Sequence, residues 1–224
     1  MSRPAGPRRA IAPIAAALRR PQLAPLLIVG FLAVAGFAAF EVTFAQFVHA
    51  RLAISHRQVS FLFAYVGVLA VIVQGTLVGA LTRRLGERRM VLAGLSLTAA
   101  ALLLLASAHR LAVILGALPL LTLGTGVTAP SLSALVSHGA AADEQGMALG
   151  AYQGVGSLAR VAGPFLAQLA LGHLGVASPA VAAAVLTLLA AWSLVAWQRR
   201  SGPLYGEAVP RRPSPRRVPG EEDP

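Results

Sequence analysis

The sequence predicts an all-α membrane protein, built as a bundle of six transmembrane helices. Of its 224 residues, 56% are hydrophobic and only 12% are charged, whereas about 25% of the residues in a soluble domain are charged. The apolar residues gather in long continuous runs, and the arginines lie in short clusters between these runs. This arrangement excludes a soluble globular enzyme and a disordered chain.

Six runs are long enough to cross the hydrocarbon core of a bilayer, which takes about 20 mainly apolar residues in a helix. Each run is continuously apolar and not alternating, so a β-barrel is not expected. In chain order the predicted spans are Pro25–His49, Val59–Thr82, Arg89–Ser107, Leu111–Ser137, Gly146–Leu174 and Pro179–Trp197.

Short polar loops set the ends of these spans and leave no room for an extramembrane domain. The five loops, in order, are Arg51–Gln58, Arg83–Arg88, Ala108–Arg110, His138–Gln145 and Gly175–Ser178. The sixth span ends where Pro, Arg and Gly become frequent. Three regions follow: a basic cytoplasmic N-terminal segment over residues 1–24, the six-helix transmembrane domain over 25–198, and a disordered cytoplasmic tail over 199–224.

The arginines also predict an orientation, because cytoplasmic loops of membrane proteins carry an excess of basic residues. Five arginines precede the first span, four lie between the second and third, and six follow the sixth, against three on the other side. Both ends are therefore expected in the cytoplasm, in a bacterial-type plasma membrane. The basic clusters then serve as anchors at the lipid bilayer, and a nucleic-acid partner is not expected.

Several kinds of chemistry have no residues to support them. The chain has no Cys, which excludes disulfides and thiolate sites. The five His lie at span ends or in loops without ligand spacing, so no metal site is expected. No phosphate-binding loop and no nucleophile with its base are present. The sequence therefore predicts neither an enzyme nor a cofactor.

Two charged residues fall deep within the predicted spans, where ionised groups are costly and must face protein or water. Glu41 lies just past the middle of the first span, and Arg160 near the middle of the fifth. Glu41 is the candidate for proton coupling, because burial favours the protonated form of a carboxylate. Arg160 is its candidate charge partner or a structural bridge between helices. A purely structural hydrogen bond or ion pair is the alternative for both.

Other residues in the spans are weaker candidates. Polar side chains line a pathway or, alternatively, hold helices together by hydrogen bonds. Glycines and prolines allow a helix to flex beside a pathway or, alternatively, allow close packing. The cavity-polar candidates are Gln46, Gln74, Tyr152 and Gln153, and the helix-flexing candidates are Pro130, Gly163 and Pro164.

Four stretches together resemble the C-terminal six-helix half of a major facilitator superfamily (MFS) transporter, closest to the drug:proton antiporter-like branch. They occur in the order found in that family and cover about Leu18 to Arg200. The stretches are Leu18–Pro21 followed by Phe40–Phe44, then Gly79–Arg89, then Leu123–Pro130, and finally Glu144–Gly146 leading to Gly156–Pro164.

The stretch Gly79–Arg89 resembles the cytoplasmic loop motif of the superfamily, Gly-x-Leu-x-Asp-Arg-x-Gly-Arg-Arg. Its motif residues here are Gly79, Arg83, Arg84, Gly86 and Arg88. Arg83 occupies the acidic position, which in the family helps to latch helices across the two halves. The four arginines also suit an orientation anchor at an anionic membrane surface.

The resemblance implies one MFS-type half with 3+3 inverted repeats, in which the first and fourth helices line a central cavity. The implied function is half of a secondary active transporter, with proton-coupled efflux of a small organic solute by alternating access. The implied partners are that solute and a second six-helix half, which is a separate chain, a missing N-terminal part or a second copy. The alternative is a six-helix membrane protein that acts, alone or as a homodimer, as a non-transporting assembly or regulatory subunit.

Overall fold

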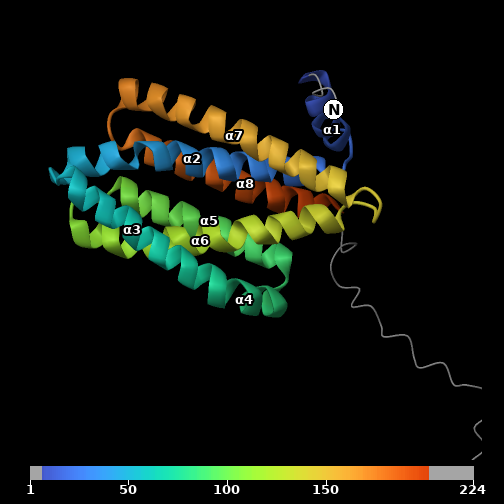
Figure 1. The fold of residues 1–224 in the computed structure, drawn as a ribbon, viewed down its shortest axis with the longest axis horizontal. Helices are drawn as coiled ribbons and strands as arrows, with labels where there is room; N and C mark the ends of the chain where they lie inside the picture. The colour runs from blue at the N-terminus through green and yellow to red at the C-terminus, as the bar shows by residue number, and fades with distance from the viewer. Residues whose placement is uncertain (1–6, 202–224) are drawn as a thin grey trace, which may run out of the picture.

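The computed structural model describes residues 7–201, and all regular structure in this part of the chain is helical. Six of its helices are long and apolar enough to cross a membrane, which confirms the predicted fold class. In Figure 1 the long helices lie side by side, and α1 and α4 lie at the same end of the bundle. The elements are α1 (Pro7–Leu18), α2 (Ala24–Leu52), α3 (His56–Ile72), η1 (Val73–Leu77), α4 (Val78–Leu85), α5 (Glu87–Ala106), α6 (Leu111–His138), α7 (Gln145–Leu174) and α8 (Ser178–Ser201).

The turn between α2 and α3 shows how local chemistry ends one span and starts the next. Helix α2 stops at Ala53, whose left-handed φ of 52° lets its N–H donate to the His49 carbonyl. Helix α3 then starts with a capping box. The Ser55 N–H donates to Gln58 Oε1 at 2.8 Å, and the Gln58 N–H donates to Ser55 Oγ at 3.4 Å. Both bonds occupy backbone donors that the first helical turn leaves free.

The second predicted span consists of three consecutive helical segments, α3, η1 and α4. A π-helical turn, η1, separates α3 from α4, and the sequence analysis did not predict it. Val73, the first residue of this turn, lies against α6, where a Cβ on Gly126 would be 2.9 Å from Val73 Cγ1. A π-helical turn widens the helix locally and often marks a functional region.

Glycines bring two pairs of helices into backbone contact. On α5 and α6, a Cβ at Gly94 would lie 2.8 Å from the Gly124 carbonyl oxygen. On α7, a Cβ at Gly163 would lie 2.3 Å from the Ala35 carbonyl oxygen of α2. Both approaches exclude a larger residue, and small residues at helix contacts are a common means of packing in membranes.

Burial is uneven among the spans. In the most apolar stretch of each span, 56% of the residues are buried in α2 and 50% in α5, against 28% in α7 and 17% in the span formed by α3 and η1. Large apolar side chains stand exposed on the two least buried spans, among them Phe61, Val71, Val161 and Phe165. Within residues 7–201, much of these two spans is therefore left uncovered.

A short helix that the sequence analysis did not predict packs at one end of the bundle. In α1, Ala17 is fully buried, and Ile14 lies over Gly154 of α7, with its Cδ1 2.8 Å from where a Cβ would stand. Just after α1, Arg20 pairs with Glu144, and its Nη2 donates to Glu144 Oε1 at 2.6 Å. The basic segment of residues 1–24 thus contains a docked helix from Pro7 onward. The tail from residue 202 lies outside the described residues, so its predicted disorder stays a prediction.

Candidate functional site

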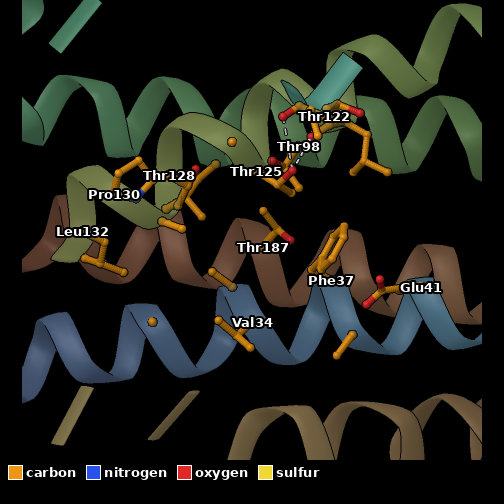
Figure 2. Close-up of a pocket in the computed structure, with 18 of the residues that line it drawn as sticks. Val34, Phe37, Glu41, Thr98, Thr122, Thr125, Thr128, Pro130, Leu132 and Thr187 are labelled. Atoms are coloured by element: carbon orange, nitrogen blue, oxygen red, sulfur yellow. Dashed lines mark hydrogen bonds between the residues drawn. The ribbon is translucent and has the colours of Figure 1, made fainter. Parts of the chain in front are cut away.

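A cavity of about 570 Å³ opens among the long helices near the middle of the bundle. Most of its lining residues come from α2 and α6, as the resemblance implied for the first and fourth spans. The other contributors are α3 with η1, α5, α7 and α8. Figure 2 shows Val34, Phe37 and Glu41 on α2 facing a group of threonines across the cavity. Its size is in the range of small-molecule sites.

Glu41 and Arg160 both line this cavity, and both side chains are exposed in this chain. Within residues 7–201 neither takes part in an ion pair. Their depths in the bundle differ. Gly163 of α7 lies against Ala35 and Ala39 of α2, and the two helices run in the same direction. Arg160 comes before this contact on α7 and Glu41 comes after it on α2, so at about 1.5 Å per residue they are offset by about 10 Å along the bundle. The cavity therefore holds two charges of opposite sign that do not neutralise each other directly.

Two of the other predicted polar residues also line the cavity, and two do not. Gln74 reaches it from the π-helical turn, and Tyr152 from α7. The Tyr152 ring packs over Gly30, where a Cβ would lie 2.7 Å from its Cε2 atom. Gln46 and Gln153 are exposed and lie outside the lining of this cavity.

The predicted flexing residues divide in the same way. Pro130 lines the cavity, whereas Gly163 and Pro164 do not. Gly163 packs tightly on α2, so its surroundings favour close packing. The irregular helical segment that reaches the cavity is η1, which the sequence analysis missed. A flexing role for the three predicted residues stays a prediction.

Comparison with known proteins identifies the family to which this six-helix bundle belongs. The family model described as Major Facilitator Superfamily matches residues 26–222. The chain belongs to this superfamily. It is therefore an integral, multi-pass membrane protein of a transporter family, and its six spans form one MFS-type half.

Two similar proteins agree with this membership. The tetracycline resistance protein, class D, of Salmonella ordonez is 33% identical over 120 residues, which are 54% of this chain and 30% of that protein. The crystal structure of the human organic anion transporter MFSD10 (TETRAN) matches with a TM-score of 0.70 and 27% identity, over 87% of this chain and 43% of that chain. The matched part of this chain thus covers less than half the length of either protein.

The MFS loop motif lies at the turn between α4 and α5, at the end of the bundle that carries α1. Gly86 takes a φ of 74°, which favours glycine, and it precedes the first turn of α5. Glu87, which stands at a basic position of the motif, lies 3.5 Å from His138 Nδ1. The Arg88 guanidinium lies over the Trp197 ring at 5.2 Å. Gly79 and Arg84 are exposed, and the side chain of Arg83 lies outside the described part.

Five threonines in the cavity lining were not predicted. They come from three helices and are Thr98, Thr122, Thr125, Thr128 and Thr187. Three of them follow each other at intervals of three residues on α6, a spacing that puts side chains on one helix face. That spacing was visible in the sequence, but threonine is also frequent in ordinary helix contacts.

Residues 7–201 contain no group of three or more metal-ligating side chains. The Arg20–Glu144 pair lies outside the cavity and outside the spans. The hydrogen bond from Arg20 lowers the pKa of Glu144 below its usual 4.5, and the Glu144 carboxylate raises the pKa of Arg20. This pair joins two of the stretches that carry the MFS resemblance.

Proposed function

We propose that this chain is one half of a secondary active transporter that exports a small organic solute by proton-coupled alternating access. The observation that carries the proposal is the cavity, which collects Glu41 and Arg160, the two charged residues deep within the spans. Intramembrane charges are costly and usually mark a pathway for ions or substrate. The names of the two similar proteins, a tetracycline resistance protein and an organic anion transporter, support a small organic solute.

Glu41 is the proposed proton-coupling residue. Its side chain is exposed to the cavity in this conformation. Closing the cavity would remove water from the carboxylate, and an apolar environment favours the protonated form. Such a group binds a proton on one side of the membrane and releases it on the other, which is the step that an antiporter requires. Arg160 is the proposed charge partner, which balances Glu41 when the cavity closes, or a bridge between helices.

A second six-helix half is the proposed partner of α3 and α7. These spans are the least buried, and they border the cavity. In full-length MFS transporters the substrate site lies between two halves. The arginine distribution supports both described ends facing the cytoplasm of a bacterial-type plasma membrane. The alternative is a non-transporting assembly or regulatory subunit, which would bind another membrane protein through the same exposed spans.

The test is gradient-driven flux by the assembled transporter. The chain is reconstituted in liposomes with a six-helix N-terminal half, and tetracycline serves as the first solute. We expect accumulation that depends on the proton gradient, and we expect Glu41→Gln to abolish that dependence. Asp143→Asn is the matched control, because it removes a carboxylate from an exposed loop and should leave flux unchanged.

Two outcomes would count against the proposal. Unchanged gradient-driven accumulation in Glu41→Gln would remove this residue from the coupling step. A chain that enhances or assembles another membrane protein, yet carries no solute with any six-helix partner, would favour the regulatory-subunit alternative.

A further inference from the structure

The threonines on α6 present only acceptor atoms to the cavity. The Thr122 hydroxyl donates to the Leu118 carbonyl at 2.8 Å, and the Thr125 hydroxyl donates to the Leu121 carbonyl at 2.9 Å. A hydroxyl has one hydrogen to donate and two lone pairs that accept. Because both hydrogens are used within α6, these side chains offer lone pairs to any molecule in the cavity.

Glu41 lies at nearly the same depth as these oxygens. Leu132 of α6 and Gly30 of α2 meet near one end of the cavity, with 3.5 Å between Leu132 Cδ2 and a Cβ at Gly30. The two helices run in opposite directions. Ten residues back along α6 is Thr122, and ten residues forward along α2 is Phe40, so both lie about 15 Å from this contact and at the same depth. Figure 2 shows Glu41 and Thr122 toward the same end of the cavity and Leu132 toward the other.

One class of chemical group matches this arrangement. A carboxylate and hydroxyl lone pairs all accept hydrogen bonds, so their complement is a cation that carries N–H donors. Arg160 is offset by about 10 Å, and its Nη1 is turned toward Gly156, 3.7 Å from where a Cβ would stand there. It therefore does not occupy the acceptor-rich end.

We propose that Glu41, Thr122 and Thr125 form a subsite for the N–H-bearing ammonium group of an organic amine. The inference rests on the proposed function, because it assigns a substrate class to the transporter cavity. It also predicts discrimination. A quaternary ammonium has the same charge but no donors, so it would leave the threonine oxygens unpaired and bind more weakly.

The experiment compares two probes of equal charge on the purified full chain in lipid nanodiscs. The probes are 2-(1-naphthyl)ethylammonium and its N,N,N-trimethyl counterpart, and the measurement is equilibrium binding by naphthyl fluorescence. We expect the primary ammonium to bind at least about tenfold more tightly, as for a charge-assisted hydrogen bond. Thr122→Val, which removes a lone-pair oxygen at nearly constant volume, should reduce that preference to about threefold or less.

Thr43→Val is the matched control. Thr43 is also buried and donates to its own helix, to the Ala39 carbonyl at 3.0 Å, but it does not line the cavity. The control should keep the full preference. If Thr122→Val does not fold, Thr125→Val provides the same test at the neighbouring oxygen, and Thr122→Ser, which keeps the oxygen, should retain the preference.

Equal binding of the two probes, or no binding of either, would overturn the subsite. A preference unchanged in both Thr122→Val and Thr125→Val would also overturn it. These results are separate from the proposed function. Gradient-driven flux with no preference between the probes would leave the transporter assignment standing without the amine subsite, whereas a clear preference without flux would leave the subsite and remove the transport role.

Discussion

Two glycines of α6, only two residues apart, meet very different neighbours. At Gly124 a Cβ would lie 2.4 Å from Thr98 Oγ1 and 2.8 Å from the Gly94 carbonyl oxygen on α5. At Gly126 it would meet only the Val73 side chain at the start of the π-helical turn, at 2.9 Å. Backbone cannot yield as a side chain can. One side of α6 therefore packs on the backbone of α5. The other side packs on a side chain of the segment formed by α3 and η1, which can shift more easily.

The largest expected effect comes from a substitution that forces α5 and α6 apart. Gly124→Ala places a methyl group against the backbone of α5, so α5 and α6 must separate. Overpacking of this kind costs about 1–3 kcal/mol and occasionally more. The free energy of unfolding, measured by SDS titration in mixed micelles, should fall by about 3 kcal/mol.

Gly116→Ala on the same helix provides the control for that experiment. Nothing lies within 4 Å of a Cβ at Gly116, so alanine should be neutral or slightly stabilising there, because it favours the helix. Equal destabilisation by both changes would show that α5 and α6 are not held by close glycine contact.

A smaller effect is expected from the same substitution on the other face. In Gly126→Ala the new methyl group meets the end of the Val73 side chain. This side chain can shift, because the span formed by α3 and η1 is the least buried. The free energy of unfolding should fall by less than about 1 kcal/mol, measured as for Gly124→Ala. A loss as large as that of Gly124→Ala would mean that the contact between α6 and η1 is as rigid as the contact between α5 and α6.

The smallest effect concerns charges at the surface of the bundle. The Arg20 hydrogen bond lowers the pKa of Glu144 below its usual 4.5. A lowered carboxylate pKa stabilises the folded chain above the unfolded pKa, and this contribution disappears as the pH falls through the folded pKa. Glu144→Gln should therefore lower the unfolding temperature slightly near pH 7, and the difference from wild type should shrink as the pH falls below 4.5 and vanish once the pH is below the lowered pKa of Glu144. A difference that persists or grows in acid would contradict this role of the pair.

The sequence predicted the spans well, because an apolar helix must be long enough to cross the bilayer and polar loops mark where it ends. It did not predict which face of each helix points inward. The runs are apolar all round, so they carry no period that distinguishes a cavity face from a packed face. This is why Gln74 and Gln46 were equal candidates, although only Gln74 lines the cavity.

The features that were missed depend on contacts between distant segments. The π-helical turn at Val73 lies opposite Gly126, and α1 is docked through Ile14 on Gly154. The oxygen of Thr98 is left without a partner by the packing of α5 on α6. None of these relations is local in sequence. The motif residues were easier to locate, because a tight turn such as that at Gly86 is encoded within a few residues.

The separation of Glu41 from Arg160 has an energetic consequence for the bundle in the membrane. Each ionised group near the bilayer centre costs about 2.5–3.5 kcal/mol on insertion scales, and within residues 7–201 the two do not cancel each other as an ion pair. The six-helix bundle on its own therefore carries that cost, and within residues 7–201 it also leaves much of α3 and α7 exposed. The proposed second half would lower both costs by covering α3 and α7 and closing the cavity over the two charges.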